Sequence, residues 1–144
     1  MQIEDYIGYL LVQICKAHHD LAEVGLSELG LHTGQEMLLL QLYAEDGLTQ
    51  SQLAERGCVE PPTITKKVDR MESSGFVTRR PDPNDARVSR VYLTEDSKAL
   101  EKSVVGVWSR LEERLLEGFT ETERVLLRRL LMQMLENLKS EQKP

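Results

Sequence analysis

The sequence predicts a mostly α-helical chain of six helices that carries one small β-hairpin. Apolar residues recur at spacings of three and four along most of the chain, whereas residues 76–93 change to a period of two. Short turn sequences that contain glycine separate the periodic stretches. The length of 144 residues lies within the usual range for one domain. We therefore expect a single domain over residues 1–144.

The first half of the chain contains three of the expected helices. The first carries one apolar seam with alternating spacings of four and three, formed by Ile3, Ile7, Leu10, Ile14, Ala17, Leu21 and Val24. A second helix is predicted to open at a capping box, Thr33-Gly34-Gln35-Glu36, and to run to about Ala44. A further capping box, Thr49-Gln50-Ser51-Gln52, opens a short helix over residues 49–56. Gly57 then makes a turn.

Residues 61–74 are predicted to form the helix around which the chain is organised. Ile64, Val68 and Met71 share one apolar stripe, and Gly75 is the expected C-cap. The opposite face is polar and carries Pro62, Thr63, Lys66, Asp69, Arg70 and Ser73, with Thr65 and Lys67 on its flanks. With the preceding short helix this makes a helix-turn-helix, whose hydroxyls and cations suit the major groove of DNA.

The hairpin that follows is predicted to be an arginine-bearing wing. Arg79 and Arg80 belong to its first strand and Arg90 to its second, and residues 81–87 have turn chemistry. Two prolines restrict the turn, so Arg87 is expected to project from a stiff tip toward a minor groove. Asp85 is expected to hold the Arg87 guanidinium in a bidentate pair, and Asp69 to pair with a wing arginine such as Arg87 or Arg90.

Charge is distributed unevenly along the chain. The net charge is −6, which by itself argues against nucleic acid. Residues 49–94, however, hold eight Lys/Arg against six Asp/Glu, whereas the rest of the chain holds ten against eighteen. The positive charge is thus concentrated where the predicted helix-turn-helix and wing lie, and this favours DNA as the partner.

Two further helices follow the wing. Thr94 is expected to cap a long helix that carries Trp108 and ends at Gly118, and Thr120-Glu121-Thr122-Glu123 opens the last helix. The last helix presents a broad apolar stripe of Leu127, Leu130, Leu131, Met134, Leu135 and Leu138. We expect residues 1–24 and 95–140 to dimerise the chain through an interface of roughly 2,000 Å² or more.

The wing and the helix-turn-helix resemble those of the MarR family of bacterial transcription regulators. Asp85-Ala86-Arg87, followed by Val91-Tyr92-Leu93-Thr94, is similar to the family's wing signature D-x-R-x(5)-L-T. Residues 53–56, 62–65 and 68–72 resemble its helix-turn-helix. The resemblance implies a homodimeric regulator, usually a repressor, that binds a pseudo-palindromic operator through residues of about 33–94. The DNA-binding candidates are Pro62, Thr63, Thr65, Lys66, Arg70, Arg79, Arg80, Asp85, Arg87 and Arg90.

One feature departs from the family pattern. The predicted recognition helix opens with Glu60-Pro61, where many members have Ser or Asp followed by a basic or polar residue. Glu60 would repel a phosphate and Pro61 offers no N–H, so this helix start disfavours a phosphate clamp.

The resemblance also implies release of DNA by a small molecule, often aromatic or phenolic, or by an oxidant. Candidate effector-binding residues are Cys15, His18, His19, Met37 and Trp108. The first helix leaves alternatives open: Cys15 as an oxidant sensor, a metal shared by Cys15, His18, His19 and Glu23, or ordinary packing of a buried thiol and a hydrogen-bonded imidazole. Cys58 is interpreted as a small hydrophobic residue.

Other classes of function have little support in the sequence. The chain has no H-E-x-x-H, phosphate loop or nucleophile elbow, so we expect no enzyme, no catalytic residue and no cofactor. It has no apolar run long enough to span a bilayer and no basic amino-terminal region, and two cysteines fit a reducing compartment, so a cytoplasmic location is expected. A helical assembly module that binds no DNA would explain the leucines but not the wing.

Overall fold

The computed structural model describes residues 1–57 and 59–141. Cys58 lies outside the described residues, and so does its interpretation as a small hydrophobic residue. Within the described ranges the chain forms seven α-helices, one short 3₁₀ helix and one three-stranded sheet, which confirms the mostly helical class. The chain divides into two compact units, residues 1–111 and 112–144.

The first unit begins with η1 (Ile3–Asp5) and α1 (Ile7–Ser27). Helix α1 buries only Ala22 and Leu26. All seven residues of the predicted apolar seam are exposed. The seam is therefore not used for packing within the unit.

Helix α2 (Gln35–Ala44) begins later than expected. Its N-cap is Gly34, whose φ of 101° is a left-handed conformation that glycine adopts without strain. The predicted capping box at Thr33 is wrong, because the Thr33 hydroxyl donates to the Glu23 carboxylate of α1 instead. The Glu36 side chain, only 2% exposed, accepts a hydrogen bond from the Gly34 N–H at 2.7 Å.

The helix-turn-helix consists of α3 (Gln50–Arg56) and α4 (Pro61–Ser73). The capping box of Thr49 with Gln52 is present and opens α3 as predicted. Ile64, Val68 and Met71 are at most 4% exposed, which confirms the apolar stripe of α4. The other face of α4 is left to solvent.

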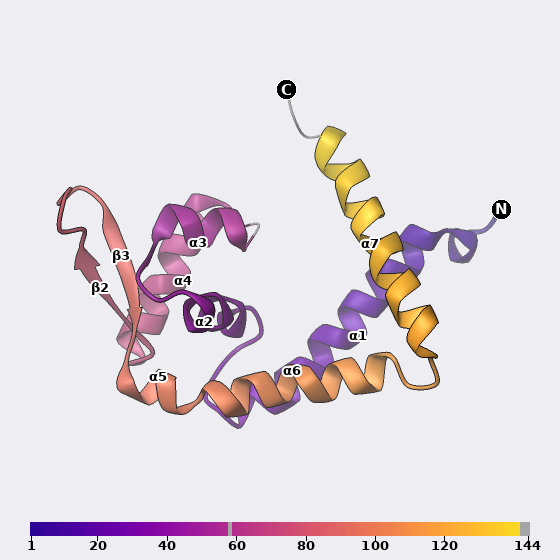
Figure 1. Cartoon of the computed structure of the whole chain (residues 1–144), viewed down its shortest axis with the longest axis horizontal. Coiled ribbons are helices and arrows are strands. Elements are labelled where there is room, and N and C mark those ends of the chain that lie inside the picture. The colour runs from indigo at the N-terminus through magenta and orange to yellow at the C-terminus, as the bar shows by residue number, and fades with distance from the viewer. Residues whose placement is uncertain (58, 142–144) are drawn as a thin grey trace. The chain divides into compact units, whose positions relative to one another are not determined.

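The wing belongs to a sheet with one more strand than the sequence predicted. Strands β2 (Val77–Pro81) and β3 (Ser89–Leu93) pair antiparallel, with Val77 opposite Leu93 and Pro81 opposite Ser89. The additional strand β1 (Leu48–Thr49) pairs with Val91 and Arg90, so the strand order is β1-β3-β2. Figure 1 shows α2, α3 and α4 gathered beside the hairpin, whose tip extends away from them.

A single core joins these elements. Leu39 of α2, Leu53 of α3, Val68 of α4 and Val91 of β3 are all fully buried in one cluster. The turn before β1 approaches β3 closely, because a Cβ added to Gly47 (φ 73°) would lie 2.7 Å from Tyr92 Cε1. The wing is thus fixed to the helices that it follows in sequence.

The helices after the wing differ from the prediction. Thr94 caps the short helix α5 (Glu95–Ala99), and the chain then turns at Leu100 before α6 (Glu101–Leu115). The expected single helix is therefore two, which raises the number of helices from six to seven.

The second unit ends in α7 (Glu121–Glu141). Thr120 and Glu123 form the predicted reciprocal cap at its start. Helix α7 buries none of its residues. Among the helices within residues 1–57 and 59–141, none is long and apolar enough to cross a membrane.

Candidate nucleic-acid interface

The outer face of α4 carries cations without internal partners. Pro62, Thr63, Lys66 and Arg70 are exposed, and neither Lys66 nor Arg70 forms an ion pair within the described parts of the chain. Thr65 is different, because its hydroxyl donates to the Pro61 carbonyl at 3.1 Å and accepts from Gln50 Nε2 at 3.2 Å. The charges of Lys66 and Arg70 remain available to an anionic partner.

The wing tip has the bidentate pair that the sequence predicted. Arg87 Nε and Nη2 donate to the two carboxylate oxygens of Asp85 at 3.0 and 3.2 Å. The Arg87 side chain is 90% exposed. Hydrogen bonds from Arg87 lower the pKa of Asp85 from its ordinary value.

The start of the wing's turn is held by a second ion pair. Asp82 accepts from the backbone N–H of Asn84 at 2.8 Å and from Arg90 Nε at 2.5 Å. The bond from Arg90, more than the backbone bonds, lowers the pKa of Asp82. Arg90 also donates to the Gly47 carbonyl at 2.8 Å, which ties β3 to the turn before β1. The Arg90 guanidinium is therefore bonded to groups of the protein itself.

Arg79 joins three elements. From β2 it donates to Gln50 Oε1 of α3 at 2.6 Å and to the Thr65 carbonyl of α4 at 3.1 Å. It also pairs with Asp69 at 2.6 Å and with Glu72 at 3.4 Å, both on α4. Asp69 thus pairs with a wing arginine, but the prediction that the arginine would be Arg87 or Arg90 is wrong. Those two are already paired with carboxylates of the turn.

Arg80 lies on the outer edge of the sheet. Its guanidinium carbon is 3.9 Å from the centroid of the Tyr92 ring. This cation–π contact fixes the side chain but leaves its N–H groups exposed to solvent.

A cavity of about 730 Å³ adjoins the exposed face of α4. Its lining comes from the loop before α2 and from α4, and consists of His32, Thr33, Gln35, Thr63, Lys66, Lys67, Asp69, Arg70, Ser73 and Ser74. Seven of these were not predicted as site residues: His32, Thr33, Gln35, Lys67, Asp69, Ser73 and Ser74. The first three follow no helical period, and Lys67 was placed on a flank; only the fold brings the loop to α4.

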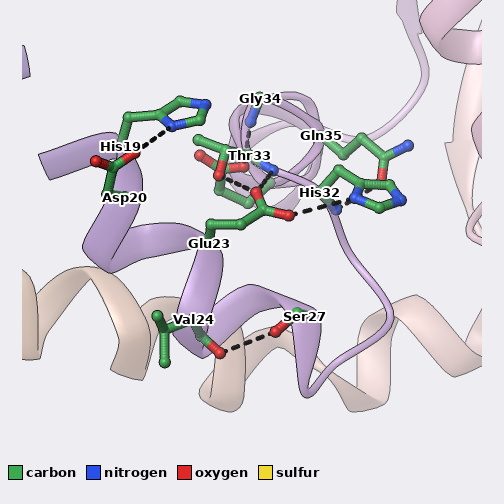
Figure 2. Close-up of polar contacts among 10 residues, drawn as sticks. His19, Asp20, Glu23, Val24, Ser27, His32, Thr33, Gly34 and Gln35 are labelled. Atoms are coloured by element: carbon green, nitrogen blue, oxygen red, sulfur yellow. Dashed lines mark hydrogen bonds and ion pairs between the residues drawn. The ribbon is translucent and has the colours of Figure 1, made fainter. Parts of the chain in front are cut away.

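Carboxylates of neighbouring elements hold that loop in place. Figure 2 shows the Glu23 side chain of α1 directed at Thr33 and at the imidazole of His32. Glu23 accepts from the Thr33 backbone N–H at 2.8 Å, from the Thr33 hydroxyl, and lies 3.3 Å from His32 Nδ1. The two bonds from Thr33 are the main reason that the pKa of Glu23 falls to about 2.

The effector candidates are only partly brought together. His18 of α1 and Trp108 of α6 make an edge-to-face contact with ring centroids 5.2 Å apart, and the buried Trp108 Nε1 has no hydrogen-bond partner among the described residues. Cys15 is exposed, and His19 lies 3.5 Å from the exposed Asp20. Met37 lines a separate cavity of about 210 Å³ between α2, α3 and α4.

The first helix offers no three-ligand metal cluster. Across residues 1–57 and 59–141, no three His, Cys, Asp or Glu side chains come together as metal ligands would. Glu23, an alternative ligand beside His19 in the sequence, is instead engaged by Thr33 and His32.

The arrangement of α3, α4 and the wing, with its exposed cations, defines a winged-helix DNA-binding protein. Comparison with known proteins agrees. The MarR family model matches residues 31–89. The uncharacterized HTH-type transcriptional regulator YybA of Bacillus subtilis is 26% identical over 125 residues, which cover 87% of this chain and 83% of YybA.

Two solved structures extend the similarity over nearly the whole chain. A MarR-family transcriptional regulator from Silicibacter pomeroyi is 30% identical, with a TM-score of 0.78, and the match covers 94% of this chain and 92% of that one. A cysteine-to-serine mutant of MarR from E. coli, solved with operator DNA, is 28% identical, with a TM-score of 0.83 and coverage of 90% and 93%. This chain belongs to the MarR family and is a DNA-binding transcription regulator. At the level of the family, that role is regulatory rather than enzymatic.

Proposed function

We propose that the protein represses transcription as a homodimer bound to a pseudo-palindromic operator, and that a small molecule releases it. The observation that carries the DNA-binding mode is the pairing of an exposed, cation-bearing face on α4 with a wing whose tip presents Arg87. Helix α4 enters the major groove and Arg87 the adjacent minor groove. Residues of about 33–94 form the DNA-binding part of a single MarR-like domain.

The candidate DNA-binding residues divide by their internal contacts. Pro62, Thr63, Lys66 and Arg70 are exposed on α4 and contact bases or phosphates directly, as Arg87 does from the wing. The other five hold these groups in place or contact the backbone at the edge of the interface: Thr65, Arg79, Arg80, Asp85 and Arg90.

The exposed apolar faces of the end helices support dimerisation. Helix α7 buries none of its 21 residues. Its apolar stripe is open to solvent, since Leu130, Leu131, Leu135 and Leu138 are each 39–66% exposed. The seam of α1 is equally uncovered, with Ile7 60% and Val24 65% exposed. Apolar surface of this extent on two long helices is typical of an interface between copies.

The operator experiment tests the DNA-binding mode and the dimer together. Sedimentation of the free protein gives its mass, and footprinting locates the protected bases. We expect a dimer that protects two inverted half-sites about one helical turn apart. A monomer that protects a single asymmetric site would contradict the proposal.

We further propose that the effector acts through the helices that set the spacing of the two α4 helices. The edge-to-face pair of His18 and Trp108 and the unpartnered Trp108 Nε1 support a site for an aromatic ligand with a hydrogen-bond acceptor. Cys15 and His19 are further candidates for this site, and Met37 contributes through the cavity that it lines. A coupling of ~1–3 kcal/mol would lower operator affinity about 5- to 150-fold.

Oxidant sensing is the second candidate, because the Cys15 thiol is exposed. Three treatments of one operator complex separate the routes: salicylate, an organic hydroperoxide with and without Cys15→Ser, and a zinc chelator. Release by salicylate alone supports the aromatic site. Peroxide release that Cys15→Ser abolishes supports thiol sensing, and release by the chelator supports a metal. If no treatment releases the DNA, the proposed regulation is wrong.

A further inference from the structure

The cavity between the loop before α2 and the face of α4 has the lining of an anion site. Lys66, Lys67 and Arg70 all line it, against one carboxylate, that of Asp69. Asp69 is paired with Arg79, which does not line the cavity, at 2.6 Å. The positive charge of the lining is therefore left largely uncompensated.

We propose that this cavity is an oxyanion site that takes a phosphate group. The phosphate has two possible sources with the same chemistry, a backbone phosphate of bound DNA or a free phosphorylated molecule. The proposal goes beyond the operator-binding residues given above, because His32, Gln35 and Lys67 are assigned to a ligand for the first time.

The loop before α2, which lines the cavity opposite α4, is already held in place. Glu23 takes both hydrogen-bond donors of Thr33, its backbone N–H and its hydroxyl, and lies beside His32 Nδ1 (Figure 2). Gln35 Oε1 accepts from the His32 backbone N–H at 3.0 Å, which closes the loop on itself. Thr33 therefore has no donor left for a ligand and serves as the anchor, while His32 and Gln35 face the anion. A loop fixed in this way loses little conformational entropy on binding.

Lys67 connects α4 to the loop before α2. Its Nζ donates to the Gly34 carbonyl at 3.2 Å and occupies one of the three donor positions of the ammonium. Two donor positions remain for an anion. The same bond sets the distance between α4 and the loop, so the charge of Lys67 is held at a defined place rather than on a freely moving side chain.

The lining favours phosphate over a neutral or a bulky apolar ligand. Besides its three cations it contains the hydroxyls of Thr63, Ser73 and Ser74, which donate to phosphate oxygens readily. The start of α4 does not compete for this role, since Glu60 caps it without a side-chain bond and prolines occupy its first two positions. The cavity supplies the phosphate contact that this helix start lacks.

The test uses Lys67→Gln, which removes the charge but keeps a polar side chain. Lys67→Arg keeps the charge, and Lys98→Gln is the matched control. Lys98 lies on α5, pairs with Glu95 at 3.0 Å and is outside the cavity lining, so its loss changes the net charge by the same amount. Each protein is titrated with inorganic phosphate in the absence of DNA, with NMR shifts of the His32 and Gln35 amides as the readout. Operator affinity is then measured at several salt concentrations.

We expect Lys67→Gln to lose an anion contact and Lys98→Gln to behave like the parent. If the source is free phosphate, the parent shows saturable shifts and Lys67→Gln weakens phosphate affinity by about tenfold. If the source is DNA, Lys67→Gln lowers the slope of log affinity against log salt by about 0.9, and Lys67→Arg restores it. The proposal is overturned if phosphate causes no saturable shift and the salt slope of Lys67→Gln equals that of Lys98→Gln. Such a result leaves the operator footprint and the dimer untouched, so it is distinguishable from failure of the proposed function.

Discussion

Replacement of Arg79 by methionine should show whether Arg79 stabilises the fold through internal bonds or binds DNA. Methionine retains much of the aliphatic volume but loses the side-chain bonds to Gln50, Thr65, Asp69 and Glu72, while the backbone N–H of residue 79 still donates to Glu72 at 2.8 Å. The helix-turn-helix and the wing would then be joined at this point by that backbone bond and by apolar packing.

The loss of stability in Arg79→Met follows from how exposed the Arg79 side chain and its bonding partners are. Asp69 and Glu72 are 58% and 41% exposed, so each ion pair contributes only about 0.2–1 kcal/mol. The bonds to Gln50 Oε1 and the Thr65 carbonyl come from a charged side chain that is 22% exposed, and are worth about 1 kcal/mol each. We expect Arg79→Met to lower the free energy of unfolding by about 3 kcal/mol.

Urea denaturation at one fixed protein concentration measures this change, because the stability of a dimer depends on concentration. Arg80→Met is the control, since Arg80 makes one cation–π contact, worth about 0.5–1 kcal/mol at an exposed site. The reasoning is refuted if the two variants are equally stable. The salt dependence of operator binding adds a second readout, since an arginine committed internally should leave the slope unchanged.

Four other substitutions test other parts of the molecule. Arg87→Ala should weaken operator binding by about 1–3 kcal/mol and lower the salt slope by about one without unfolding the protein; unchanged affinity would remove Arg87 from the interface. Lys66→Ala should alter affinity or base preference, as measured on operators with single base changes; an identical preference profile at unchanged affinity would contradict a contact from α4. Gly47→Ala forces a side chain into a left-handed φ of 73° and against Tyr92, and should destabilise the protein by about 1–3 kcal/mol in urea; parent-like stability would mean that this turn relaxes. The pKa of Glu23 in the folded protein, about 2, lies below its ordinary 4.5, so Glu23 contributes to stability above pH 4.5 and this contribution is lost as the pH falls toward 2. Glu23→Gln should therefore flatten that part of the curve of stability against pH. Identical curves for the two proteins would argue against the bonds to Thr33.

The elements with long apolar periods could be predicted from the sequence. The stripe of Ile64, Val68 and Met71 is buried as expected, because a helix of this length fixes which side chains share a face. The Asp85–Arg87 pair could be predicted for a similar reason, because two side chains that are two residues apart in a restricted turn have few possible positions relative to each other.

The features that the sequence did not predict depend on tertiary contacts. Strand β1 has only two residues, too few to display a period, and exists because Val91 and Arg90 of β3 offer it partners. The Thr33 capping box satisfies the local pattern, but the Glu23 carboxylate, ten residues earlier, takes the hydroxyl instead. The partner of Asp69 was unpredictable for a similar reason, because several wing arginines lay within reach in sequence and only the fold selects Arg79.

The pairing at the wing tip also has a kinetic consequence. An approaching DNA molecule attracts Lys66 and Arg70 from a distance, because no carboxylate in the described chain neutralises them, whereas Arg87 and Asp85 together present little net charge. Arg87 therefore adds little to the rate of encounter. In the proposed binding mode, Arg87 becomes attractive to DNA only at contact, when the groove replaces Asp85 as its partner. In that mode, the wing controls the rate of dissociation and with it the lifetime of the complex.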